Sequence, residues 1–121
     1  MHELSVCQSL IDQVEQIALI HGAQSVASVN LKVGPLSGIE PTLLQHAYPY
    51  ASAGTLAAES TLVIELAPLR VRCEICGTET EAQPNWLVCG ACGDCHTKLV
   101  SGDEMILMRV ELVTSKVKND V

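Results

Sequence analysis

The sequence predicts an α+β fold in which two helices pack on a small three-stranded sheet and a zinc-ribbon-like module is inserted into the chain. Three observations support this prediction. Apolar residues recur with a helical period in two segments and alternate with a period of two in three others. Four cysteines occur as two close pairs between the second and third of these strands.

The first helix is predicted over residues 3–21, where apolar side chains recur every three or four positions and form one stripe. Gly22 follows where a helix of this kind commonly ends. A half-buried strand is then predicted over residues 26–33, closed by Gly34 and Pro35. The side chains expected on the buried face of this strand are those of Ala27, Val29, Leu31 and Val33.

The second helix is predicted to begin at Pro41, because the fixed φ of proline suits the first helical turn. Pro49 is expected to kink or end this helix, since it lacks the N–H of an interior position. Two further strands are predicted over residues 61–66 and 104–113. The segment between them is rich in cysteine, glycine and polar residues, so we expect one α/β domain from residues 1–69 plus 104–121 and a small inserted domain from residues 70–103.

Composition excludes several classes of function. The chain has 121 residues, of which 48% are apolar, and its formal net charge is −7. No cluster of basic residues is present, which argues against nucleic acid as a ligand. No apolar run approaches the roughly 18 residues of a membrane span, and the first residues do not read as a signal peptide. We therefore expect a cytoplasmic protein without a membrane partner. In that compartment the six cysteines are expected to function in metal binding or redox chemistry, in preference to forming structural disulfides.

The two cysteine pairs have the spacing of a metal site. Cys73 and Cys76 are followed by Cys89 and Cys92 in the pattern C-x2-C-x12-C-x2-C, and a glycine follows each pair. Four thiolates close a tetrahedral zinc(II) site with bonds of about 2.3 Å, and the metal supplies folding energy that a small module lacks. Such a site has no open position, so we assign it a structural role. Two disulfides, an iron–sulfur cluster or a rubredoxin-like iron are the alternatives.

Three other groups of residues bear on metal chemistry. Cys95 and His96 follow the second pair, either as a solvated turn or as spare ligands that replace a cysteine of a pair. Cys7 lies on the apolar stripe of the first helix, as a small core residue does.

At the N-terminus, the amine of Met1 with the amide and imidazole nitrogens of His2 can chelate one ion, and the amide of Glu3 can complete a square plane. Planar nitrogen ligation suits nickel(II) or copper(II).

Taken together, these residues resemble the HypA/HybF nickel metallochaperones of hydrogenase maturation. The likeness covers nearly the whole chain and rests on the opening Met1-His2-Glu3-Leu4-Ser5, on His21-Gly22-Ala23, on residues 31–44 (LKVGPLSGIEPTLL), on Gly54-Thr55-Leu56-Ala57, on Gly102-Asp103-Glu104 and on the double C-x2-C.

The resemblance implies a nickel-binding domain that carries Met1, His2 and Glu3, and a zinc domain that carries Cys73, Cys76, Cys89 and Cys92. It implies a transferable nickel(II) ion, a structural zinc(II) ion and no enzymatic activity. It also implies two partners, a hydrogenase-maturation GTPase and the precursor of the [NiFe]-hydrogenase large subunit. Exposed strand edges would permit a homodimer.

Two other functions fit parts of the sequence. One is a zinc-ribbon protein-interaction module without nickel transfer, such as a transcription or translation factor, which the acidic charge and few aromatic residues disfavour. The other is a thiol oxidoreductase, which needs one exposed reactive pair of cysteines instead of two facing pairs. The sequence contains no Ser-His-Asp set, glycine-rich phosphate loop or paired-carboxylate motif for ordinary catalysis.

Overall fold

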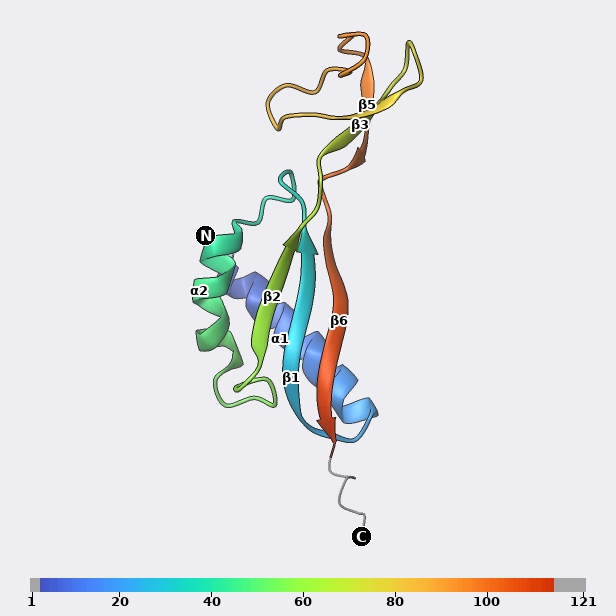
Figure 1. The fold of residues 1–121 in the computed structure, drawn as a ribbon. Helices are drawn as coiled ribbons and strands as arrows, with labels where there is room; N and C mark the ends of the chain where they lie inside the picture. The colour runs from blue at the N-terminus through green and yellow to red at the C-terminus, as the bar shows by residue number, and fades with distance from the viewer. Residues whose placement is uncertain (1–2, 115–121) are drawn as a thin grey trace. The chain divides into compact units, whose positions relative to one another are not determined.

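The structure is a computed structural model that describes residues 3–114. Its elements in chain order are α1 (Glu3–Ile20), β1 (Ala23–Val33), α2 (Pro41–Ser52), β2 (Thr61–Leu66), β3 (Arg70–Cys73), β4 (Glu79–Glu81), β5 (Thr97–Ser101) and β6 (Met105–Thr114) (Figure 1). The predicted α+β class and both helices are confirmed.

The described residues form two compact units, and each is made of separate stretches of the chain. The first unit contains residues 3–31, 40–64 and 107–114, and the second contains residues 32–39 and 65–106. Both helices therefore belong to the first unit, and all four cysteines of the two pairs belong to the second. The domain boundaries expected from the sequence stay a prediction.

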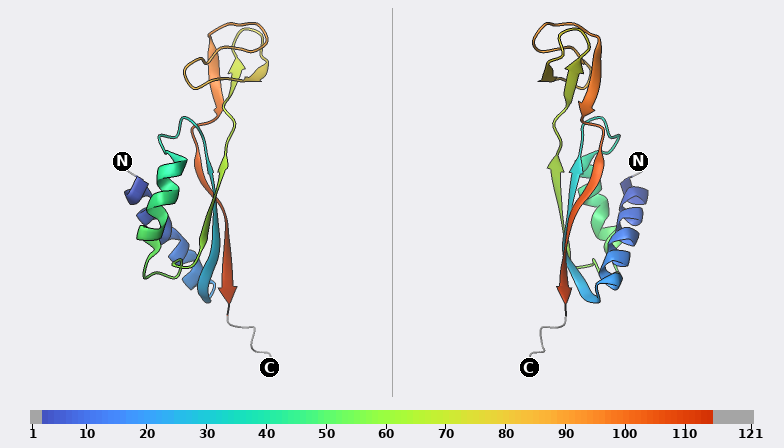
Figure 2. Two further views of the ribbon diagram at one scale, coloured as in Figure 1. Left: turned by 60° about the vertical axis from the view of Figure 1, so that its left-hand side comes forward. Right: turned by 90° about the vertical axis from the view of Figure 1, so that its right-hand side faces the viewer.

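A three-stranded sheet has the order β2-β1-β6. The arrows of β1 and β2 point the same way and that of β6 points the opposite way, so the sheet is mixed (Figure 1). Neighbouring parallel strands need a crossover connection, which α2 supplies between β1 and β2. Both helices cover one face of this sheet (Figure 2).

The core of the first unit is aliphatic. Helix α1 presents one stripe to it, as the period of its apolar residues predicts. Its buried apolar residues are Cys7, Leu10, Ile11, Val14 and Ala18. Opposite them lie the buried side chains of β1, α2 and β2, chiefly those of Val26, Val29, Leu31, Leu44 and Leu62. Among the described residues no helix is both long and apolar enough to cross a membrane.

The alternation expected along β1 is wrong at its start. Ala27 is exposed, whereas Val26 is buried together with Val29. The N–H of Val26 donates to the carbonyl of Leu56 at 2.9 Å, and the N–H of Leu56 donates to the Glu15 carboxylate at 3.0 Å. The loop after α2 therefore holds the beginning of the strand, and the regular alternation starts only at Val29.

Helix α2 does not end at Pro49 but continues to Ser52. Proline removes one backbone donor from the helix, and contacts from neighbouring residues offset that loss. Tyr48 is buried, and its hydroxyl lies 2.6 Å from the Ser60 Oγ. The Gln45 Nε2 donates to the carbonyl of Leu62 at 2.9 Å, which ties the preceding turn to β2.

The second unit contains a small antiparallel sheet of order β4-β3-β5. Arg72 is paired in register with Glu79 and forms an ion pair with it, while Arg70 and Glu81 form a second pair at 4.0 Å. The buried side chains of this unit are few: Val33, Ala67, Leu69, Val71, Cys73 and Cys89. A unit with so small a core needs another source of stability, such as a bound metal.

Candidate metal centre

The structure brings the sulfurs of Cys73, Cys76, Cys89 and Cys92 together, all within 4.8 Å of one another. The sulfurs of Cys73 and Cys92 are 3.6 Å apart, as are those of Cys76 and Cys89, and each of these contacts joins one cysteine from each pair. A tetrahedron with zinc–sulfur bonds of about 2.3 Å has edges of about 3.8 Å. The four sulfurs therefore fit a tetrahedral thiolate site.

Each cysteine pair forms the same tight turn, which we call a knuckle: the first from Cys73 to Gly77, the second from Cys89 to Gly93. The N–H of Gly77 donates to the carbonyl of Cys73 at 3.0 Å, and the N–H of Gly93 donates to that of Cys89 at 2.9 Å. Both glycines have a positive φ, 77° and 80°, which a side chain would oppose. The glycine after each pair thus lets the chain turn its two sulfurs to one point.

Backbone N–H groups point at the first sulfur of each knuckle. The Cys73 sulfur accepts from Ile75 and Cys76 at 3.3 and 3.4 Å. The Cys89 sulfur accepts from Ala91 and Cys92 at the same two distances, 3.3 and 3.4 Å. Hydrogen bonds to the charged form of a group favour that form, so both turns are built to hold thiolates.

Two of the sulfurs also have a pKa below the usual thiol value. Hydrogen bonds from the side chain and backbone of Thr78 lower the pKa of Cys76 to about 6. The backbone N–H of Cys92 lowers the pKa of Cys89. Because the thiolate is the form that binds metal, the lowered pKa of one sulfur in each knuckle favours binding. The backbone N–H of Asp94 lowers the pKa of Cys92, but the Cys73 sulfur, burial and the other sulfurs together raise it to about 12.

The second knuckle is fixed to the rest of its unit by threonine side chains. The Thr80 Oγ1 on β4 accepts from the N–H of Gly90 at 2.8 Å, and the Thr97 Oγ1 on β5 donates to the carbonyl of Leu87 at 2.7 Å. Cys73 and Cys89 are buried, whereas Cys76 and Cys92 are exposed. The second knuckle and the residues just before it are thus held from both outer strands of the small sheet.

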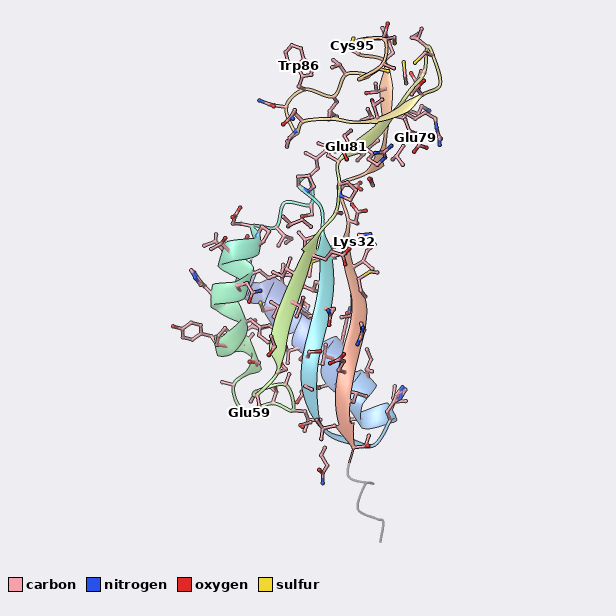
Figure 3. All side chains as sticks on the ribbon, in the orientation of Figure 1. Lys32, Glu59, Glu79, Glu81, Trp86 and Cys95 are labelled. Atoms are coloured by element: carbon pink, nitrogen blue, oxygen red, sulfur yellow. The ribbon has the colours of Figure 1, made fainter. Side chains whose placement is uncertain are left out.

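A second group of ligand atoms lies beside the second knuckle, on the loop that precedes β5 (Figure 3). Its members are Asp94, Cys95 and His96. The sequence predicted Cys95 and His96 as candidate ligands but did not indicate Asp94. An aspartate two positions before a histidine was the available signal, since a short polar side chain there can reach back to the following backbone.

Of the three predicted nickel ligands, Met1 and His2 lie outside the described residues. Glu3 begins α1 and is only 7% exposed. Its Oε2 accepts from the N–H of Glu40, just before α2, at 3.2 Å. The carboxylate of Glu3 therefore ties the start of the first helix to the start of the second, a role that the sequence did not indicate.

Cys7 is a core residue, separate from the knuckles. Its sulfur is fully buried in the first unit and donates to the carbonyl of Leu44 at 3.5 Å. Burial, together with the charge of Glu3, raises the pKa of Cys7 to about 11. Only about one molecule in a thousand would carry the reactive thiolate at pH 8.

The cysteines should therefore react with a thiol reagent in three groups. In protein that contains one equivalent of zinc at pH 8 we expect Cys95 to be alkylated first, because it is exposed and outside the four-sulfur cluster. The knuckle cysteines should react only after a chelator has removed zinc, and Cys7 only after unfolding. Peptide mass spectrometry of timed samples measures this order. Labelling of the knuckles at the rate of Cys95 before chelation would contradict the site.

A small α+β protein with a zinc-ribbon-like module of two facing knuckles belongs to the class of metal-binding proteins. Over residues 1–112 the chain matches the family described as "Hydrogenase/urease nickel incorporation, metallochaperone, hypA". The chain belongs to this HypA family of nickel-incorporation metallochaperones.

Similar proteins and a solved structure are also named HypA, in agreement with this assignment. A hydrogenase maturation factor HypA from Nitrosospira multiformis is 60% identical over 115 residues, which cover 95% of this chain and 100% of the relative. One from Aquifex aeolicus is 38% identical over 112 residues, covering 93% and 97%. The solution structure of the Ni metallochaperone HypA from Helicobacter pylori is similar with a TM-score of 0.67 at 25% identity, covering 95% of this chain and 100% of that one.

Proposed function

We propose that this chain binds nickel(II) at its N-terminus and delivers it for the maturation of [NiFe]-hydrogenase, while zinc(II) in the knuckles has a structural role. The observation that carries the proposal is the family match over residues 1–112, which includes both the Met1-His2-Glu3 start and the four knuckle cysteines. The four-sulfur cluster adds independent support for zinc.

The proposed nickel ligands are nitrogens of the first residues. The amine of Met1 and the amide of His2 close a five-membered ring, and the same amide with the imidazole Nδ1 closes a six-membered ring. The backbone nitrogen of Glu3 supplies a fourth planar position. Nickel(II) gains from planar nitrogen ligation, whereas zinc(II) has no such geometric preference. The kind of ligand therefore favours nickel(II) or copper(II) over zinc(II).

Release of nickel follows from the same chemistry. Amide and imidazole nitrogens must lose or lack a proton to bind, so binding releases protons and acidification returns them. As the pH falls, protons compete with nickel for the imidazole and amide nitrogens, and the proposed site gives up the ion. A site of this kind suits an ion that is to be transferred.

Zinc in the knuckles would be held by Cys73, Cys76, Cys89 and Cys92. Four protein ligands leave no position for water or substrate, so the ion orders the module and supplies no catalytic step. We accordingly assign the chain no enzymatic activity.

The proposed partners are a hydrogenase-maturation GTPase and the precursor of the hydrogenase large subunit, both in the cytoplasm, with no membrane or nucleic acid involved. A homodimer is compatible with this role, since β2 and β6 are the outer strands of their sheet.

The decisive test is His2→Ala in protein with a native, untagged N-terminus. We expect nickel affinity to fall at least about 100-fold, because the six-membered chelate ring loses its imidazole ligand. His46→Ala, on the exposed side of α2, is the matched control and should bind nickel normally. Calorimetric titration measures affinity, and elemental analysis verifies that zinc content is unchanged. Equal nickel affinity in both variants would refute the N-terminal site.

One observation favours the alternative of a protein-interaction module without nickel transfer. Ile75, in the first knuckle, and Trp86, before the second, are each 65% exposed. Apolar side chains displayed on a metal-held loop suit contact with another protein. Unchanged nickel delivery to hydrogenase precursor by His2→Ala would favour this alternative.

A further inference from the structure

We propose that Asp94, Cys95 and His96 form a second metal site, an open one, for a borderline divalent transition ion such as cobalt(II), nickel(II) or zinc(II). One ligand atom from each of the three side chains lies within 4.8 Å of the others. The site is separate from the four-sulfur cluster, because it uses none of the knuckle sulfurs.

The backbone of this tripeptide is fixed from both ends. The carbonyl of Asp94 accepts from the N–H of Cys89 in the second knuckle at 2.9 Å, and the carbonyl of His96 accepts from the N–H of Glu74 in the first knuckle at 2.8 Å. The N–H of Thr97 donates to the carbonyl of Cys95 at 3.0 Å and closes the turn. The three side chains are therefore presented by an ordered turn, which reduces the entropy lost on binding.

The side chains of Asp94 and His96 are already in contact. The Asp94 Oδ1 accepts from the backbone N–H of His96 at 2.7 Å and lies 2.6 Å from the imidazole Nδ1. A carboxylate in contact with a ring nitrogen fixes the orientation of the imidazole, and an ion bound by both groups would replace the proton that they share. Two of the three proposed ligand groups are thus held together before any ion binds.

The ligand types define the class of ion. A thiolate is soft, an imidazole is intermediate and a carboxylate is hard, and this mixture suits borderline transition ions better than calcium or magnesium. Three ligands leave at least one coordination position open to water or to a donor from another molecule. The side chain of His96 is 67% exposed. An ion held here would exchange faster than zinc held by four sulfurs.

Cobalt(II) is the probe, because its bonds to thiolate sulfur absorb in the near ultraviolet and its d–d bands report coordination. Full-length protein containing one equivalent of zinc is titrated with cobalt(II) while the zinc content of the desalted protein is measured. We expect a thiolate–cobalt band to grow with one further equivalent while zinc is retained. Cys95→Ser should remove the band, and His96→Gln should weaken cobalt binding at least about tenfold.

Controls separate this site from the two described above. His2→Ala should leave the thiolate band intact, since the proposed N-terminal site contains no sulfur, so either proposal can fail alone. The second site is refuted by absence of the band at millimolar cobalt, by its persistence in Cys95→Ser, or by its appearance only as zinc is displaced. It is equally refuted if Cys95→Ser lowers the zinc content, because Cys95 would then belong to the structural site.

Discussion

Replacing Cys73 with serine should abolish binding of the proposed structural zinc and unfold the module, while the two helices persist. Cys73 is 1% exposed, and its sulfur lies 3.6 Å from that of Cys92 and accepts two backbone N–H groups. Zinc binding supplies roughly 10–16 kcal/mol to small structural modules of this kind. The few apolar side chains buried in the second unit cannot replace that contribution.

Two spectroscopic signals distinguish the units in this experiment. Trp86 is the only tryptophan of the chain and lies in the second unit, so its fluorescence reports on the module. Both helices lie in the first unit, so far-ultraviolet circular dichroism reports chiefly on that part. We expect the fluorescence of Cys73→Ser to match that of chelator-treated wild type, with the helical signal retained and zinc reduced to well below one equivalent.

Cys95→Ser is the matched control, since it makes the same chemical change at a cysteine outside the four-sulfur cluster. It should retain one equivalent of zinc and the wild-type fluorescence. A full equivalent of zinc in Cys73→Ser, measured by elemental analysis after desalting, would contradict the assignment of this residue as a ligand.

Gly34→Ala is expected to destabilise the protein by at least about 3 kcal/mol, for a purely steric reason. A Cβ at this position would lie 2.1 Å from the carbonyl oxygen of Gly102 and 2.8 Å from the Glu104 Oε1. The N–H of Gly34 also donates to the carbonyl of Glu104 at 2.8 Å, and that of Leu36 donates to Gly102 at 2.6 Å. The backbone would have to separate where these hydrogen bonds form, so the substitution cannot be absorbed by a side-chain rotation.

Gly38→Ala isolates this steric effect. Gly38 belongs to the same unit and has a φ of 83°, but a Cβ there would meet nothing within 4 Å. Its substitution should cost only about 1–2 kcal/mol of left-handed backbone strain. Thermal unfolding followed by circular dichroism should show Gly34→Ala melting about 10 °C or more below wild type. A melting temperature for Gly34→Ala at or above that of Gly38→Ala would overturn the explanation.

The sequence predicted those features that depend on local patterns. The stripe of α1 could be predicted because one face of the helix is apolar and buried. In β6 the strand itself was predicted, but its burial does not follow the alternation of the sequence, since Ile106 and Met108 are exposed. The four-cysteine cluster could be read because C-x2-C confines two sulfurs to one turn, whatever the rest of the chain does.

Other features depend on contacts between distant residues and gave no local signal. Val26 replaces Ala27 on the buried side because a loop some thirty residues later holds its N–H. Helix α2 passes through Pro49 because Tyr48 and its neighbours are anchored to residues beyond the helix. The contact between Asp94 and His96 likewise depends on the turn that hydrogen bonds from both knuckles hold, and a local pattern does not predict that turn.

The division of the second unit between two stretches of chain limits how it could be exchanged in evolution. Residues 32–39 contribute to this unit although they are encoded between the segments that form the helical one. Recombination that transferred only the cysteine-rich stretch would therefore leave out part of the unit. Variation that alters this stretch has to remain compatible with a short sequence some thirty positions upstream, so the two are expected to change together.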